Sequence, residues 1–323
     1  MRDPRFWQKD GLVPKLLSPL SLLWRAGACV RAKTTTARHP GCPVFCVGNF
    51  TVGGAGKTPT SVALFDVLSA LGRHPHFVSR GYGGSIAGPH RVDPDLDDAS
   101  KVGDEPLLLA HHGPAWISRE RFLGAEMARD AGADAIILDD GLQNPSLIKD
   151  CSFAVIDSNY GIGNGRVMPA GPMREPLISG LEKVHAIILI GDKTPDFITN
   201  LPASVPILRA RIVPVNGDRF AGKNVVAFAG IGRPQKFYDS LASVGARIVA
   251  TQDFDDHHVF APDELTALRM TAAKLDAELV TTQKDLMRLP SDSRNGINSL
   301  DIRLVFEAPD QLSQIVKTVL ADG

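Results

Sequence analysis

One glycine-rich segment constrains the fold of this chain more than any other feature. The segment Gly48–Thr58, with the sequence GNFTVGGAGKT, follows the apolar run Val44–Val47 and precedes a helical pattern over Pro59–Leu71. It matches the phosphate-binding template G-x-x-x-x-G-K-[ST], except that Thr51 stands at the first glycine position. A strand, a glycine-rich loop and a helix in this order surround a phosphate with backbone N–H groups and the positive end of the helix. The pattern predicts a nucleotide-binding α/β sheet.

Two chemical roles follow from this loop. We expect Lys57 to contact the β- and γ-phosphates and the Thr58 hydroxyl to bind Mg²⁺. A phosphate loop also needs an acidic partner at the end of a neighbouring strand, and Asp139 and Asp140 follow the apolar run Ala135–Leu138. We predict that Asp139 binds Mg²⁺ and that Asp140 shares this duty or fixes a neighbour. The other predicted ATP-binding residues are Thr51, Val52, Gly53, Gly54, Ala55 and Gly56.

The sequence favours ATP over GTP as the nucleotide. Guanine-selective P-loop proteins usually carry an N-K-x-D element. The nearest match is Ala273–Asp276, AKLD, which lacks the Asn and has a helical pattern. Gly230 and Gly232 follow another strand, but without the third glycine they make only a weak dinucleotide fingerprint.

The 323 residues correspond to about two domains. Apolar strands separated by helices predict a mostly parallel, P-loop NTPase-like sheet with helices on both faces, followed by a smaller α/β series. We expect an N-terminal helical segment over 1–35, a P-loop domain over 36–213 and a smaller α/β domain over 214–323, whose last strand and helix either stay there or return to the first domain. The boundary is expected near 205–223, where Pro and Gly cluster and little is periodic. The expected strands are Val44–Val47, His76–Ser79, Trp116–Ile117, Ala135–Leu138, Phe153–Ile156, Ala186–Ile190, Asn224–Ala229, Arg247–Ala250, Glu278–Thr281 and Asp301–Phe306.

Charge is unevenly distributed along the chain. The net charge of −1 argues against nucleic acid as a partner, yet residues 1–40 carry a charge of +6. Leu16, Leu20, Leu23 and Trp24 fall on one helical face with basic residues around them, whereas interruptions by charges and prolines argue against a membrane span. Two hypotheses remain for this segment: a helix lying in the interface of an anionic bilayer, or a helix packed on its own domain. The four cysteines match no usual zinc pattern and indicate free thiols in a reducing compartment.

Four further polar groups have both a structural and a functional interpretation. Asp104, in the segment GDEP, either caps a helix or accepts a proton from a substrate hydroxyl. Arg80 and Tyr82 lie in a loop at the carboxyl end of a strand, where α/β proteins bind ligands. His257 either belongs to a surface turn or orients a carboxylate across a domain cleft. Lys284 lies in the segment Thr281–Asp285, which is expected to end a strand, and it either contacts a substrate phosphate or is solvated.

Together these segments resemble the tetraacyldisaccharide 4′-kinases, the lipid A 4′-kinases. The P-loop alone is common to many proteins, but the ordered set is highly specific. The matching segments are Val47–Pro59, Ser79–Gly83, Gly103–Pro106, Ile137–Gln143, Gly163–Arg166, Pro169–Pro176, Ala229–Gly232, Asp256–His257 and Thr281–Asp285. The chain departs from the family pattern at Asn144, where His is expected, and at Arg119–Arg121, where Asp-Arg is commoner.

The resemblance implies an enzyme that transfers the γ-phosphate of ATP, with Mg²⁺, to the 4′-hydroxyl of a lipid A disaccharide precursor. It implies two α/β domains joined by a short two-stranded linker, with an N-terminal helix at the cytoplasmic face of a bacterial inner membrane and no obligate protein partner. It assigns Asp104 as the base and His257 as its assistant, with Lys57 at the phosphates. The candidate substrate-binding residues are Arg80, Tyr82, Glu105, Arg121, Gln143, Arg174 and Lys284.

Two alternative functions stay open from the sequence. A P-loop regulatory ATPase or GTPase that assists cofactor or metal insertion has the same strand, loop and helix, but needs neither an acceptor base nor an interfacial helix. A soluble small-molecule kinase needs the base but not the membrane helix.

Overall fold

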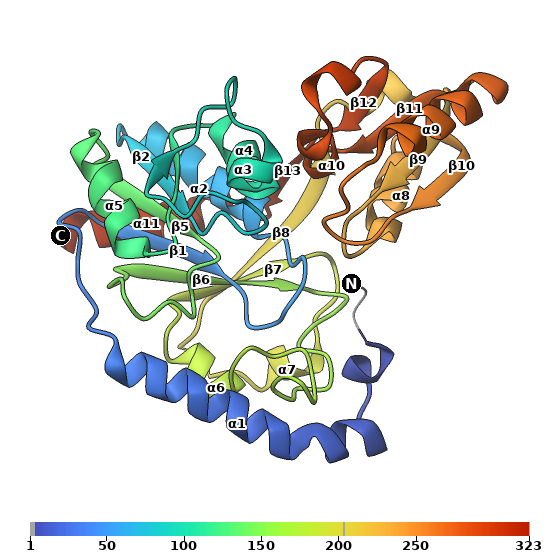
Figure 1. Ribbon diagram of the computed structural model, residues 1–323. Coiled ribbons are helices and arrows are strands. Elements are labelled where there is room, and N and C mark those ends of the chain that lie inside the picture. Colours follow the sequence, from blue (N-terminus) through green and yellow to red (C-terminus); the bar gives the residue numbers. More distant parts are fainter. Residues whose placement is uncertain (1–3, 203, 323) are drawn as a thin grey trace.

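The chain forms a large sheet and a smaller sheet, which lie apart in Figure 1. The described residues give the large sheet nine strands and the smaller one four. A computed structural model describes residues 4–202 and 204–322; Arg2 and Asp3, which count toward the charge of the N-terminal segment, lie outside the described residues. In the described chain the large sheet has the order β13-β8-β7-β6-β1-β5-β2-β4-β3 and the smaller sheet the order β10-β9-β11-β12.

The strands and helices have the following bounds. The strands are β1 (Val44–Gly48), β2 (Pro75–Ser79), β3 (His90–Arg91), β4 (Ala115–Ile117), β5 (Ala135–Asp139), β6 (Cys151–Asp157), β7 (Ala186–Ile190), β8 (Ile207–Pro214), β9 (Asn224–Ala229), β10 (Arg247–Asp253), β11 (Glu278–Thr282), β12 (Ile297–Leu300) and β13 (Ile302–Phe306). The α-helices are α1 (Leu12–Thr34), α2 (Lys57–Ala70), α3 (Ala99–Val102), α4 (Asp104–Ala110), α5 (Arg121–Asp130), α6 (Leu177–Leu181), α7 (Asp196–Thr199), α8 (Pro234–Ser243), α9 (Pro262–Lys274), α10 (Gln283–Arg288) and α11 (Pro309–Asp322).

The large sheet is parallel from β8 through β4, and only its edge strands β3 and β13 run antiparallel to their neighbours. Side chains alternate between the two faces of a strand, and β1 illustrates this. Phe45 and Val47 belong to the core that includes Leu64 of α2, whereas Val44 and Cys46 belong to the core on the other face. Burial on both faces explains why the strands are continuous apolar runs. The predicted mostly parallel P-loop sheet is confirmed.

The smaller sheet repeats this arrangement with fewer elements. All its strand pairs are parallel. Phe237 and Leu241 of α8 pack in the core on one face, and Leu265 and Leu268 of α9 pack in the core on the other.

The chain passes from the large sheet to the small one through β8 and returns through β13. These two strands pair antiparallel from Ile302 opposite Pro214 to Phe306 opposite Ala210, and Leu312 of α11 then packs in the same core as α2. The prediction that 205–223 lacks periodic structure is wrong, because β8 spans Ile207–Pro214. Arg209 and Arg211 interrupt its apolar run, since only alternate side chains of this strand are buried.

Two boundaries near the end of the chain also differ from expectation. The expected strand Asp301–Phe306 is preceded by a separate strand, β12, which pairs with β11 in the small sheet. Lys284 was expected at the end of a strand but lies in the first turn of α10, which begins at Gln283.

Helix α1 runs along the outside of the large domain (Figure 1) and continues through Pro19. One side of it is fixed to the glycine- and proline-rich segment Gly163–Pro176: the Ser21 hydroxyl donates to the Val167 carbonyl at 2.7 Å, and the Trp24 indole N–H donates to the Arg174 carbonyl at 3.1 Å. Its other side leaves Leu12, Leu16, Leu20 and Leu23 at least half exposed. Among the described residues, no helix is long and apolar enough to cross a membrane.

Candidate active site

The phosphate loop connects the buried end of β1 to the first turn of α2. Gly53 and Gly56 both have φ near +99°, in the left-handed region that glycine adopts without strain. A Cβ atom at Gly56 would lie 2.5 Å from Cδ1 of Ile190, so β7 also leaves no room for a side chain there. The Val52 amide donates to the Pro172 carbonyl at 2.9 Å and is therefore already paired within the protein. The amides at the start of α2 have no partner within their own helix, as at every helix N-terminus.

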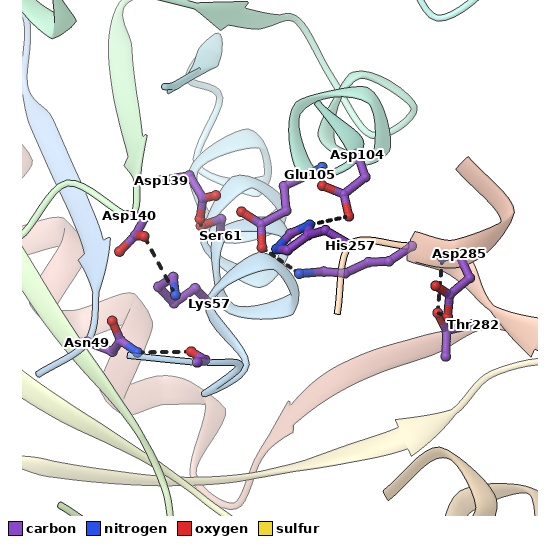
Figure 2. A network of polar contacts seen from close by, with 12 residues as sticks. Asn49, Lys57, Ser61, Asp104, Glu105, Asp139, Asp140, His257, Thr282 and Asp285 are labelled. Carbon is purple, nitrogen blue, oxygen red and sulfur yellow. Dashed lines mark hydrogen bonds and ion pairs between the residues drawn. The ribbon is translucent and has the colours of Figure 1, made fainter. Parts of the chain in front are cut away.

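Lys57 and Asp140 lie together at the mouth of the loop (Figure 2). The Lys57 side chain is 9% exposed, and its Nζ is 3.8 Å from Oδ2 of Asp140. Asp140 also receives two parallel hydrogen bonds from Arg174, at 3.0 and 3.1 Å. These ion pairs place Asp140 beside two cations, and both roles predicted for it, a share in Mg²⁺ binding and the fixing of a neighbour, stay predictions.

Three buried oxygen atoms at the loop have no hydrogen-bond partner among the described residues: Oδ1 of Asn49, Oγ1 of Thr58 and Oδ2 of Asp139. The second carboxylate oxygen of Asp139 accepts a bond from the Ser61 hydroxyl at 2.7 Å, which fixes its orientation. Unpaired buried oxygens are costly, and hard oxygen ligands are those that Mg²⁺ prefers. The described chain has no group of three or more His, Cys, Asp or Glu residues suited to a metal. A site of one hydroxyl and one carboxylate fits Mg²⁺, which keeps waters and substrate phosphates as its remaining ligands.

Burial dominates the ionisation of Asp139. Its complete burial, reinforced by the negative charge of Glu105, raises the pKa of the Asp139 carboxyl to about 7. A cation at this carboxylate would oppose that shift, because it stabilises the ionised form.

Asp104 and His257 meet from opposite domains, although 153 residues separate them in sequence. Asp104 is the first residue of α4 and only 4% exposed, and its Oδ2 lies 3.4 Å from Nδ1 of His257. Arg288 of α10 contacts the same carboxylate oxygen through Nε at 2.9 Å and also through Nη2. Burial alone would raise the pKa of the Asp104 carboxyl, but the His257 hydrogen bond and the Arg288 charge outweigh it and hold that pKa well below its usual range. Asp104 is therefore ionised at neutral pH.

The backbone of His257 occupies an uncommon conformation. Its φ is +59°, in the left-handed region that non-glycine residues rarely adopt, and such outliers gather at functional sites. The hydrogen bond to Asp104 raises the pKa of His257, which burial opposes. The ring centroid of Tyr82 lies 5.4 Å from that of His257, which brings the loop after β2 to the same place.

Glu105 and Lys284 form a second contact between α4 and α10, with 2.5 Å between Nζ and Oε1. In Figure 2 the Glu105 carboxylate extends from α4 between the Asp139–Ser61 pair and His257. Lys284 is therefore paired with an acidic side chain across the domain boundary rather than free in solvent.

A third contact between the domains lies away from α4. Asp157, at the end of β6 and 3% exposed, forms ion pairs with Arg233 and Lys236 at the start of α8. The Arg233 guanidinium also lies 4.0 Å from the centroid of the Tyr160 ring. These contacts fix the small sheet against the carboxyl end of the large one.

A cleft of about 1730 Å³ runs along the phosphate loop, Glu105, His257, Lys284 and Arg288, and it is larger than a typical pocket for one small ligand. Three predicted site residues, Thr51, Asp104 and Asp139, are buried and do not line it. Arg121 lines it although it is 6% exposed, and its guanidinium donates to the Ser118 and Arg119 carbonyls at 3.1 and 3.2 Å. Gln143 lines it while its amide bonds the Asn49 carbonyl at 3.0 Å. The predicted site residues along this cleft are Val52, Gly53, Gly54, Ala55, Gly56, Lys57, Thr58, Arg80, Tyr82, Glu105, Arg121, Asp140, Gln143, Arg174, His257 and Lys284.

Sequence analysis missed Arg288. Arg288 follows Asp285 by three residues on α10. An oppositely charged pair at this spacing indicates a helix, and it was the sequence signal that could have identified Arg288. The segment was expected to end a strand, whereas in the structure α10 begins at Gln283 and places the two charges one helical turn apart.

The chain matches a known family over nearly its full length. The family model described as "Tetraacyldisaccharide-1-P 4'-kinase" matches residues 13–321. A protein of Rhodospirillum rubrum named tetraacyldisaccharide 4'-kinase is 47% identical over 314 residues, which cover 96% of this chain and 95% of that protein. A protein of the same name from Dinoroseobacter shibae is 45% identical over 333 residues, covering 100% of this chain and 99% of that protein.

A solved structure supports the fold. The crystal structure of LpxK from Aquifex aeolicus in complex with ATP superposes with a TM-score of 0.76 and 24% identity, covering 95% of this chain and 99% of that one. The similarity extends over both sheets, and the resemblance inferred from the motifs is confirmed. The chain belongs to the tetraacyldisaccharide-1-P 4'-kinase family.

Proposed function

We propose that this protein transfers the γ-phosphate of ATP to the 4′-hydroxyl of a tetraacyl disaccharide 1-phosphate, a step of lipid A biosynthesis. The observation that carries the proposal is that the phosphate loop and His257 line one cleft, with the buried and ionised Asp104 in contact with His257, in a member of this family. A cleft of this size accommodates a nucleotide together with an acceptor sugar.

Lys57 and the loop amides hold the β- and γ-phosphates, and Thr58 and Asp139 hold Mg²⁺. The unpaired buried oxygens Oγ1 of Thr58 and Oδ2 of Asp139 support this assignment. Mg²⁺ supplies charge neutralisation at the β- and γ-phosphate oxygens. Arg174 fixes Asp140, which in turn positions the Lys57 ammonium.

Asp104 accepts the proton of the acceptor hydroxyl, and His257 orients the carboxylate. Its low pKa leaves this carboxyl ionised and so competent as an acceptor, although it makes Asp104 a weak base. A weak base suffices because phosphoryl transfer depends mainly on positioning and on charge stabilisation. We assign Arg80, Tyr82 and Arg121 to the acceptor side of the cleft, with Gln143, Arg174, Glu105 and Lys284 around them.

The test is ATP consumption with and without the tetraacyl disaccharide 1-phosphate. We expect ADP to form only when the acceptor is present, with no matching release of inorganic phosphate. ATP or GTP hydrolysis that proceeds without the acceptor would instead support the alternative, a regulatory P-loop ATPase or GTPase.

Helix α1 lies in the interface of an anionic membrane, at the cytoplasmic face of the inner membrane. Its exposed leucines supply the apolar face, and the exposed Arg25, Arg31 and Lys33 supply the attraction for acidic headgroups. The bonds of Ser21 and Trp24 support an orientation in which this face points away from the domain.

Replacing Leu16, Leu20 and Leu23 together by Ser is expected to weaken binding to vesicles that contain anionic lipid by about 1000-fold, because each leucine loses roughly 1.5 kcal/mol of burial. The unfolding midpoint stays unchanged, since all three side chains are exposed. Vesicle cosedimentation measures the effect. The matched control replaces the exposed Leu96, Val249 and Met270 by Ser. Equal vesicle binding by both triple variants would contradict the assignment of α1 as the membrane contact.

A further inference from the structure

Arg288 joins the two domains at the side chain assigned as the base. Its side chain is 6% exposed although it is an arginine. One edge of the guanidinium contacts Asp104 of the large domain, with Nε at 2.9 Å from Oδ2. Nη1 donates to Oδ1 of Asp285 at 2.8 Å and to the Gly230 carbonyl at 2.6 Å, both in the small domain. The planar fork of an arginine can serve three acceptors at once, which a lysine cannot do.

The Gly230 carbonyl oxygen accepts hydrogen bonds from both Arg288 and His257. It accepts the His257 backbone N–H at 3.1 Å as well as the Arg288 bond. A Cβ at Gly230 would lie 3.1 Å from the Asp255 carbonyl oxygen and 3.2 Å from Oδ1 of Asp285, so a side chain here would displace the turn or the anchor. The small domain therefore presents Arg288 and His257 as one rigid pair.

Both members of this pair meet the same oxygen of Asp104. His257 Nδ1 lies 3.4 Å from Oδ2 of Asp104 and 3.3 Å from Nη2 of Arg288. The shorter Arg288 contacts define where the carboxylate lies, and His257 then approaches a carboxylate that is already fixed.

We propose that Arg288 is a positioning residue: it orients the Asp104 carboxylate, keeps it ionised, and makes the base depend on contact between the two domains. This inference rests on the proposed role of Asp104 as the base. Arg288 touches neither reacting group and acts through Asp104.

The charged groups around Asp104 support a pH-dependent test. His257, Arg288 and Lys284 face it from the small domain, Asp285 lies behind Arg288, and Glu105 is its neighbour on α4. Every cation in this set comes from the small domain. Burial raises the pKa of Asp104, and the hydrogen bond of His257 and the charge of Arg288 lower it. Removing Arg288 therefore raises that pKa, and the acid limb of the kcat–pH profile moves to higher pH.

Arg288→Met is expected to lower kcat roughly 100-fold and to change KM for ATP less than about twofold, because the loss concerns the base and not the phosphate loop. Its acid limb moves up by about one pH unit or more. Arg288→Lys keeps the charge without the three-way fork, so it retains an acid limb near that of the unmodified protein while kcat falls roughly tenfold. Arg247→Met, at an exposed position on β10, is the control and leaves both readouts unchanged.

The two claims fail in different ways. The inference on Arg288 is overturned, and the base assignment stands, if Asp104→Asn abolishes transfer while Arg288→Met leaves kcat and the acid limb unchanged. Asp104→Asn with near-normal turnover would overturn the base itself. In the Asp104→Asn background, Arg288→Met should cause no further loss, because both act through one group. If Arg288→Met fails to fold, Arg288→Lys decides: an acid limb displaced by a pH unit or more contradicts the inference, and an undisplaced limb with reduced kcat supports it.

Discussion

Asp104→Ala is expected to lower kcat for transfer to the acceptor roughly 1000-fold while the affinity for ATP stays the same. The reason is that the acceptor hydroxyl loses its proton acceptor, and a positioned base contributes about 10² to 10⁴ in rate. ATP is proposed to bind at the phosphate loop, whereas Asp104 contacts Arg288 and His257. Arg288 keeps Asp285 and the Gly230 carbonyl as partners in this variant, so the fold remains.

Two measurements separate these effects: turnover with the tetraacyl disaccharide 1-phosphate, and equilibrium binding of ATP. Asp104→Asn serves as the nearly isosteric second variant. Asp95→Asn, at an exposed aspartate of the same domain, is the matched control and keeps full turnover. Turnover within a few-fold of the unmodified protein in both Asp104 variants would contradict the base assignment.

Lys57→Met is expected to lower kcat roughly 100- to 1000-fold, the loss typical of removing one preorganised group that stabilises charge in the transition state. Lys57 is nearly buried at the loop, and the methionine side chain of the variant is flexible, apolar and of similar length, so it fills the same space. Asp140 remains paired with Arg174 in this variant, so its carboxylate keeps a cationic partner. Pre-steady-state phosphoryl transfer at saturating ATP measures the loss directly.

The control for this change is Lys274→Met, which removes an exposed ammonium from the end of α9. It should leave transfer unchanged. If Lys57→Met raised only KM for ATP and left kcat alone, the ammonium would contribute to ground-state binding rather than to the transferring phosphate.

Local sequence was sufficient to predict the phosphate loop. Strand, glycines, Lys57, Thr58 and helix follow one another within one short segment, so the chemistry is contained in adjacent residues. The parallel sheet was predictable for a similar reason, since strands buried on both faces are continuous apolar runs. The strand β8 was not predicted because Arg209 and Arg211 alternate with its buried residues and interrupt the apolar run.

The second half of the site depends on tertiary contacts that no local pattern encodes. Asp104 and His257 were paired only through the family resemblance, because sequence spacing says nothing about which turn of one domain meets which helix of another. Arg288 was not predicted because the segment that forms α10 was expected to end a strand. Only in a helix do Arg288 and Asp285, three residues apart, lie side by side. For α1, the bonds of Ser21 and Trp24 show contact with the domain, whereas the exposed leucines leave the membrane interface a prediction.

The most direct test of the proposed reaction is the position of the new phosphate in the product. The protein is incubated with ATP, Mg²⁺ and tetraacyl disaccharide 1-phosphate, and the purified glycolipid is examined by correlated proton–phosphorus NMR. The account predicts a second phosphorus signal coupled to the proton on the 4′ carbon, and none with Asp104→Ala. A phosphate coupled to any other carbon, or consumption of ATP with an unchanged glycolipid, would contradict it.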